Sequence, residues 1–561
     1  MNKNTKWLIV ILVVAAFLRL YKIESVPVSL FGDELDVGYH ALSILKTGRD
    51  YQGNLMPLHF HSLAEWRTPL YLYSAVPTVA LFGISSLGVR LPAAIFGVMG
   101  VWMMWLLVKK ISGDGKVAIL SSLVLAISPW HLQYSRAAFE VTMLLLFFLG
   151  GLYLFYKGLE DGRWLWLSAL GLSLTPWIYS TAKLFMPFFI LLLIVVYRKK
   201  LFELSKKYLA GAIVVMVFLW GVLGYTIVAG GAAQRFSYVG IFSDPTIEHE
   251  VGVARLNDAR VRGELGEGLS PKLVDRLLHN KYVIWGDSII GNYMTSYSFD
   301  FLFADGDPNL RHTIEGMGMF YAIEFVALGV GIVVFLAKQR DTKVKWLIVG
   351  WLVLAPLPAA LTRDGGNHAT RLILLLPPLV ILIAYGVSKI NKYIGLLYAL
   401  GLLIGFIFYQ HNYWFHNPWY SERWWHAGYE QAIDAVKKHE NEYDKVVIST
   451  VNEPPWIFFA GWYEYPPDRW QKEFPIGNDI QLEGFGRVSH IDKFYFGNLE
   501  KYDFYEWDKI LDEGTLYLAV ASEAGVNLIM EPGRLPSGLR LIEAIAYPSG
   551  EPAFYLVSKK G

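Results

Sequence analysis

The chain of 561 residues contains no cysteine, and only 18% of its residues are charged. Without cysteine it can form no disulfide, thiol nucleophile or Cys-ligated metal site. Charged residues make up about a quarter of an ordinary soluble chain, so the composition argues against a soluble protein. The formal net charge of +1 creates no field that would attract nucleic acid, and no nucleic-acid partner is predicted.

Several familiar site signatures are also missing. No glycine-rich phosphate-binding loop follows a predicted strand, which argues against a nucleotide donor. No His-Glu-x-x-His motif occurs, and His59 and His61 lack neighbouring carboxylates in a known metal pattern. Asp33, Glu34 and Asp36 could hold a divalent cation, but their spacing is not specific. We therefore predict no cofactor and no metal, with a divalent cation as the alternative.

Apolar sequence is abundant: 54% of residues are hydrophobic, and the 20 Trp and 33 Tyr suit membrane interfaces. Apolar runs alternate with short polar loops from Trp7 to Tyr409, which predicts an α-helical polytopic membrane protein with about eleven transmembrane helices. The segment Pro69 to Gly83 is short and interrupted by proline, so we expect a re-entrant or interfacial helix there. The expected spans are residues 6–23, 86–108, 117–134, 141–157, 164–181, 184–197, 208–229, 316–337, 346–361, 372–388 and 393–409.

Lys and Arg collect in alternate loops, and loops rich in these residues stay cytoplasmic. This pattern predicts a multi-pass protein of the cell membrane with a cytoplasmic N-terminus and an uncleaved first helix. A transmembrane domain is expected over residues 1–409, with large outer loops at about 24–85 and 230–315. The second outer loop carries a charged helical stretch around Arg255 to Gly268.

The remaining residues, 410–561, are expected to form a small extracytoplasmic α/β domain. Ala427 to His439 has helical spacing. β-Branched and apolar runs predict strands at Lys445–Thr450, Thr515–Ala521 and Ala553–Val557.

Asp33 and Glu34 follow the first predicted helix directly, so they lie close to the outer membrane surface. Asp33 could be a helix N-cap, with Asp36 in an imperfect capping box, for an amphipathic helix through Leu45. Alternatively, Asp33 could be a general base that accepts the proton of an attacking hydroxyl or amine. The residues alone fit both interpretations equally well.

A series of short motifs resembles the GT-C superfamily of membrane glycosyltransferases, in particular the branch with protein O-mannosyltransferases and aminoarabinose transferases. The order and spacing of the motifs carry the resemblance, which covers roughly residues 7–200. Later helices agree in layout. The motifs are Phe31–Glu34, Thr47–Asp50, Arg67–Tyr71, Leu81–Gly83, Arg90–Pro92, Ser128–Trp130 and Ser135–Arg136 with Glu140, and later Asn367–Arg371.

The resemblance implies an enzyme that transfers a hexose or pentose from a polyprenyl-phosphate carrier at the non-cytoplasmic face. Asp33 matches the first acidic residue of the family's outer loop, which acts as base or orients the acceptor, with inversion at the anomeric carbon. Glu34 would support it. Arg67 stands where the aminoarabinose branch often has lysine. The positive charge is kept, but the compact ammonium of lysine is replaced by a planar guanidinium with several hydrogen-bond donors. Donor and acceptor identity are therefore not carried over.

A lipid-phosphate donor needs cations at the outer interface. Arg363 and Arg371, with His368 between them, lie in one predicted outer loop, and Arg136 lies in another. A lone interfacial arginine more commonly snorkels to lipid headgroups. Glu140 stands four residues after Arg136, so an intrahelical ion pair explains these two nearly as well as substrate binding does.

Two other functions are open. A lipid or solute transporter would place ionisable residues near the bilayer midplane, where the sequence offers little beyond Glu324. A membrane-anchored carbohydrate-binding protein would use aromatic side chains of the tail, such as Trp424-Trp425 and Trp456–Phe459, although core packing explains these better. The expected partners are membrane lipids, a polyprenyl-phosphate sugar and an acceptor whose class, protein, lipid or glycan, the sequence does not define.

Overall fold

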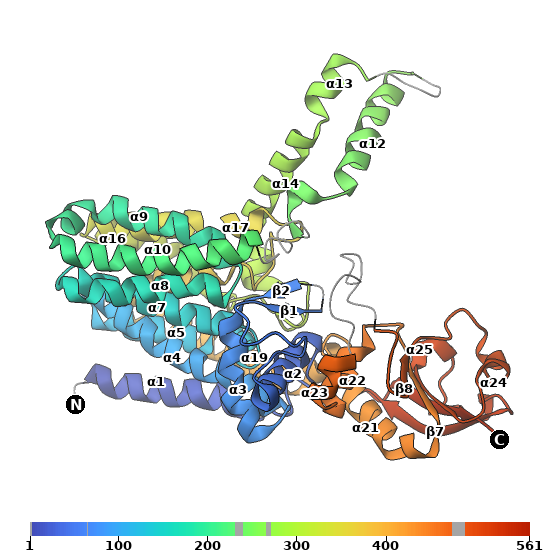
Figure 1. Ribbon diagram of the computed structural model, residues 1–561. Helices are drawn as coiled ribbons and strands as arrows, with labels where there is room; N and C mark the ends of the chain where they lie inside the picture. The colour runs from blue at the N-terminus through green and yellow to red at the C-terminus, as the bar shows by residue number, and fades with distance from the viewer. Residues whose placement is uncertain (1–2, 64, 230–238, 265–270, 474–487) are drawn as a thin grey trace.

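The computed structural model describes residues 3–63, 65–229, 239–264, 271–473 and 488–561. A body of long helices lying side by side carries, at one end, a smaller part built on a mixed β-sheet (Figure 1). The N-terminus lies at the opposite end of the helical body from the sheet. This arrangement confirms the predicted polytopic α-helical membrane fold.

Each of the eleven predicted spans coincides with one helix or with two consecutive helices. By length and composition, six helices within the described residues are suited to cross a membrane, or seven if the bent pair α5–α6 (58°) forms one span. The number of crossings therefore stays a prediction.

The helices that correspond to the eleven predicted spans are, in chain order, α1 (Lys3–Leu20), α4 (Ser86–Ser112), α5 (Gly115–Ile127) with α6 (Pro129–Ser135), α7 (Val141–Gly158), α8 (Leu165–Ile178), α9 (Thr181–Glu203), α10 (Lys206–Ala229), α15 (Ile323–Lys338), α16 (Thr342–Leu354) with α17 (Leu357–Ala360), α18 (Leu376–Lys389) and α19 (Lys392–His411).

The segment predicted as the first outer loop folds into helix α2 (Gly32–Thr47), a hairpin of β1 (Phe60–Ser62) and β2 (Glu65–Arg67), and helix α3 (Pro69–Phe82). Phe31 is the N-cap of α2 and gives no side-chain cap, so the predicted capping role of Asp33 is wrong. Asp33 instead lies in the first helical turn, where the dipole favours acidic side chains. Helix α3 coincides with the predicted short segment and begins with proline at a position that tolerates it.

The segment predicted as the second outer loop contains an arm of helices that projects away from the helical body (Figure 1). Its helices are α12 (Thr246–Val261), α13 (Leu273–Leu278) and α14 (Lys281–Thr295). Part of the helix predicted around Arg255 belongs to α12, while residues 265–268 of that prediction lie outside the described residues. The short π-helical turn η3 (Asp300–Ala304) then leads toward α15.

In the tail, the predicted helix and all three predicted strands are present. The sheet order is β4 (His490–Ile491), β5 (Phe494–Phe496), β3 (Lys445–Ile448), β6 (Thr515–Val520), β8 (Pro552–Lys559) and β7 (Leu539–Ala546), with helix α21 (Tyr429–His439) beside the sheet. The three central strands β5, β3 and β6 run parallel to one another. Strand β4 on one side and strands β8 and β7 on the other pair antiparallel with their neighbours.

The tail packs directly on α2. Helices α22 (Pro455–Tyr463) and α23 (Pro467–Glu473) lie against it (Figure 1). The Tyr39 hydroxyl donates to the Tyr465 carbonyl at 2.8 Å, and the Gln471 amide donates to the Ser43 hydroxyl at 2.9 Å. The helix that carries Asp33 is therefore held between the membrane helices and the tail.

Candidate active site

The acidic residues at the start of α2 have three different environments. Asp33 is partly exposed, and within the described residues its carboxylate makes no hydrogen bond or ion pair. Glu34 is fully buried. Its carboxylate accepts hydrogen bonds from Nε and Nη2 of Arg90 at 2.9 and 2.7 Å and from the Ala138 N–H at 2.8 Å. Glu34 thus anchors the first turn of α2, while the Asp33 carboxylate stays available.

Arg67 connects three elements around Asp33. Its Nη1 donates to the Asp33 carbonyl at 3.0 Å and to Oδ2 of Asp36 at 3.2 Å, and its Nη2 donates to Oε1 of Glu140 at 2.8 Å. Burial by itself lowers the pKa of Arg67, but Glu140, Asp33 and Asp36 outweigh it and raise the pKa well above its usual value. The guanidinium therefore stays charged and holds α2 and the start of α7 together.

Arg136 does not form the intrahelical ion pair with Glu140 that the sequence offered as one interpretation. The residues between Arg136 and Glu140 are not helical, so the expected intrahelical ion pair is absent. Its guanidinium is buried, donates to the carbonyls of Leu18 and Val26 at 2.8 Å, and lies over the ring of Trp414 at 4.7 Å. These contacts fasten the end of α1, and they do not bring Arg136 to Asp33.

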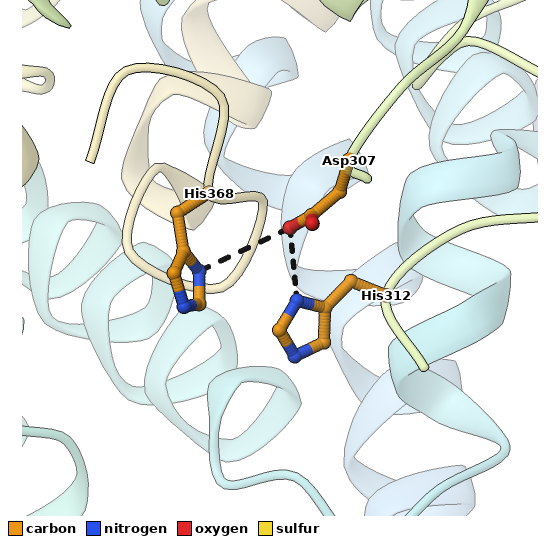
Figure 2. Close-up of side chains that lie close together, drawn as sticks. All are labelled: Asp307, His312 and His368. Carbon is orange, nitrogen blue, oxygen red and sulfur yellow. Dashed lines mark hydrogen bonds and ion pairs between the residues drawn. The ribbon is translucent and has the colours of Figure 1, made fainter. Parts of the chain in front are cut away.

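The predicted outer loop before α18 is present, but its members have separate environments. Arg363 contacts Asp244 at 3.4 Å, at the base of the arm. Arg371 donates to the Thr362 hydroxyl at 2.7 Å. His368 lies beside Asp307 and His312, which come from the loop between η3 and α15 (Figure 2).

Arg311 is a candidate that sequence reasoning missed. Its guanidinium lies over the ring of Phe31, two residues before Asp33, at 4.9 Å. In the described part of the chain no carboxylate pairs with it, and its side-chain bond is a 3.4 Å contact with Asn309. The sequence showed only that Arg311 is a cation in a predicted outer loop, just before a predicted span. That position does not indicate that it lies near the segment of Asp33.

Aromatic contacts join the surroundings of Asp33 to those of His312. The ring of Phe139, the residue before Glu140, lies 5.6 Å from the ring of Phe31 and 5.5 Å from that of His312. The rings of Phe31 and Phe139 therefore connect the segment that carries Asp33 with Arg311 and with His312.

The carboxylates proposed as a possible cation site do not converge. Glu34 is turned to Arg90 and Asp36 to Arg67, so neither shares a ligand position with Asp33. His61 is bonded to Gln52 at 2.8 Å. Among the described residues, the one group of three or more histidine and acidic side chains close enough to share an ion is Asp307, His312 and His368.

Most of the features that favoured the other two functions have structural roles, whereas Trp424 is 39% exposed. Glu324 lies in the first turn of α15, and its carboxylate accepts the Tyr321 N–H at 3.0 Å, which satisfies the start of that helix. Trp425 and the residues from Trp456 to Phe459 are buried as core. The tail does contain a cavity of about 360 Å³ beyond the ends of β3 and β6, lined by His426 and Glu453 among others.

Comparison with known proteins agrees with this architecture. Residues 67–223 match the family model for dolichyl-phosphate-mannose-protein mannosyltransferase. The structure is similar to ArnT from Cupriavidus metallidurans bound to undecaprenyl phosphate, with a TM-score of 0.54, 10% identity and 98% of each chain covered. No curated protein sequence gives a significant match.

Two further solved structures are similar at lower TM-scores. The apo oligosaccharyltransferase of Archaeoglobus fulgidus gives a TM-score of 0.47 at 12% identity over 82% of this chain, which spans 63% of that protein's length. The mycobacterial arabinofuranosyltransferase AftD gives 0.46 at 11% identity over all of this chain and 40% of AftD. The family match and the ArnT fold confirm the predicted resemblance to the GT-C membrane glycosyltransferases.

Proposed function

We propose that this protein transfers a sugar from a polyprenyl-phosphate carrier to an acceptor at the outer face of the membrane, with Asp33 as the general base. The GT-C fold, the mannosyltransferase family match and the binding of undecaprenyl phosphate by ArnT support a lipid-phosphate donor. The outer location rests on the distribution of Lys and Arg among the loops.

The observation that carries the proposal is the contrast among the carboxylates of α2. Those of Glu34 and Asp36 are buried and bonded, whereas the carboxylate of Asp33 makes no hydrogen bond or ion pair in the described chain, and its backbone carbonyl is held by Arg67. A fixed but unbonded carboxylate at a membrane surface is suited to accept a proton from a substrate.

In the proposed reaction, Asp33 takes the proton of an acceptor hydroxyl as that oxygen attacks the anomeric carbon from the face opposite the phosphate. The new carbon–oxygen bond forms while the bond to the phosphate oxygen breaks, and the bonding pair leaves with polyprenyl phosphate. The configuration at the anomeric carbon is inverted. A cation beside the phosphate stabilises the charge that grows on it.

Arg311 is the best placed cation for that role. It lies over the ring of Phe31, two residues before Asp33 in the chain, and within the described residues no carboxylate pairs with it. His368 and Arg371 remain proposed substrate contacts from the neighbouring loop. Arg67 with Glu140 and Glu34 with Arg90 instead form two buried ion pairs that position the site. Arg136 is held by the carbonyls of Leu18 and Val26 and Arg363 by Asp244, so neither is part of the proposed reaction.

The test compares wild type with Asp33→Asn in detergent or nanodiscs, using a panel of labelled polyprenyl-phosphate sugars and a membrane extract as acceptor. Asparagine keeps the size of the side chain but accepts no proton at neutral pH. Glu24→Gln is the matched control, because Glu24 is an exposed carboxylate of the same loop. We expect transfer by wild type and Glu24→Gln, and a loss of at least about 100-fold in Asp33→Asn. Equal rates in all three would exclude Asp33 as the base.

A further inference from the structure

Asp307, His312 and His368 come from two separate outer loops and converge on one point. Figure 2 shows both imidazole rings with Nδ1 turned toward the Asp307 carboxylate. Nδ1 of His312 lies 2.8 Å and Nδ1 of His368 lies 4.0 Å from Oδ2 of Asp307. One ligand atom from each residue lies within 4.8 Å of the others.

We propose that these three side chains bind one divalent transition-metal ion, and that Zn²⁺ is the ion the donors suit best. Two imidazole nitrogens and one carboxylate oxygen are a donor set that Zn²⁺ takes in proteins, with a fourth position left for water or a substrate. Mg²⁺ and Ca²⁺ prefer all-oxygen sites. The donor set therefore selects the class of metal.

The distances fit such a site. Ligand atoms at about 2.0 Å from a tetrahedral ion lie roughly 3.3 Å from one another. The separations of 2.8 and 4.0 Å from Asp307 stand on either side of that value, and the three ligand atoms lie within 4.8 Å of one another. The widest pair would therefore have to close by at most about 1.5 Å to complete the site.

The charge balance also favours an ion. Asp307 is only 3% exposed, and in the described part of the chain the ionisable groups in contact with its carboxylate are the two imidazoles. The guanidinium of the adjacent Arg311 lies over Phe31 instead. A buried carboxylate without a cation is costly, and a divalent ion held by all three groups would supply the missing charge.

The surrounding backbone holds the ligands in place. The Ala369 N–H donates to Oδ2 of Asp307 at 2.8 Å, and the indole N–H of Trp130 donates to the Ala369 carbonyl at 3.1 Å. Gly306 has φ +76°, and a side chain there would come within 2.6 Å of the Met317 carbonyl oxygen. Contacts of this kind orient metal ligands before the ion arrives.

The test measures metal directly and needs no sugar donor, so it stands whether or not the proposed transfer reaction is found. Full-length protein is stripped with EDTA, incubated with a small excess of ZnCl₂ and desalted, and its metal content is measured by mass spectrometry. Affinity is measured against a chromophoric chelator, and Co²⁺ gives the visible spectrum of a tetrahedral site. We expect about one Zn²⁺ per wild-type chain.

Variants His312→Gln and His368→Gln each remove one nitrogen ligand and should weaken Zn²⁺ binding by tenfold or more. His279→Gln is the matched control, because His279 also pairs with an aspartate, Asp258, at 2.8 Å, but lies in the arm. It should bind Zn²⁺ as wild type does.

Melting temperatures with and without Zn²⁺ separate ligand loss from misfolding. A variant that melts like stripped wild type but gains no stability from Zn²⁺ has lost a ligand. His368 is partly exposed, so its variant is expected to fold even if the variant of the buried His312 does not. The proposal is overturned if wild type retains no more Zn²⁺ than the double variant His312→Gln/His368→Gln, or if His279→Gln loses as much metal as they do.

Discussion

Replacing Arg67 by lysine tests whether this residue positions Asp33 or binds the donor phosphate. The guanidinium makes three hydrogen bonds, at 3.0 Å to the Asp33 carbonyl, 3.2 Å to Asp36 and 2.8 Å to Glu140. The single ammonium of lysine cannot reach both Asp36 and Glu140, which the two Nη atoms of arginine bond separately. We therefore expect it to keep one carboxylate and to release the other together with the Asp33 carbonyl.

The expected loss of stability is at least about 3 kcal/mol, because two hydrogen bonds of the guanidinium are lost and each contributes about 1.5–3 kcal/mol. The expected loss of rate is larger, since a displacement of roughly 1 Å at a reacting group costs about 100-fold. Because Arg67 touches the base and not the donor in this account, Arg67→Lys should lower kcat and leave the KM for the donor unchanged.

Steady-state kinetics with a polyprenyl-phosphate sugar and thermal melting in detergent measure the two effects. Glu140→Gln is the comparison variant, since it weakens the bond to Nη2 but leaves the bond from Nη1 to the Asp33 carbonyl. It should destabilise the protein with a smaller loss of kcat. A raised KM at unchanged kcat in Arg67→Lys would refute the positioning role and assign Arg67 to the donor.

Other parts of the structure give further expectations. Arg311→Gln should raise the KM for the donor about tenfold or more by removing a charge-assisted phosphate contact, and an unchanged KM would contradict that contact. Burial lowers the pKa of His40 to about 3, so the folded protein binds fewer protons than the unfolded chain below the usual value of 6.5. Stability should therefore be full above pH 6.5 and fall by roughly 3 kcal/mol at pH 4.5, and thermal melting of His40→Gln should show a weaker dependence on pH. Removal of residues 421–561 should abolish transfer because α22 and α23 pack on α2, and a truncated protein with the full rate would show that this contact is dispensable.

The membrane helices could be predicted because each depends on a local property, the length of an apolar run between polar loops. The tail strands followed in the same way from short β-branched runs. The start of α2 was harder, since acidic residues suit both a cap and a first turn. In the structure the helix begins after Phe31, whose backbone is extended, so Asp33 lies within the first turn and its side chain is not a cap.

Contacts between distant segments were not predictable. Arg136 and Glu140 have the spacing of a helical ion pair, but Arg136 is held by carbonyls of Leu18 and Val26, more than a hundred residues earlier. Glu140 is held by Arg67. No spacing in the sequence indicates such partners, because the fold alone brings these segments together.

The candidate metal site shows the same limit. His368 was singled out for its place between two arginines, whereas its partners Asp307 and His312 lie some sixty residues earlier in a polar loop without a ligand pattern. Arg311 was missed for the same reason.

The central claim, that a sugar is transferred from a lipid phosphate, is tested most directly by the fate of the bond between sugar and phosphate. Purified protein is reconstituted in vesicles that contain polyprenyl-phosphate sugars labelled in the sugar, with membrane extract added as acceptor. The account predicts that free polyprenyl phosphate appears in equal amount to the label gained by the acceptor, and that Asp33→Asn produces neither. If the labelled lipid instead crosses the bilayer with its sugar–phosphate bond intact, the protein is a transporter and the account is contradicted.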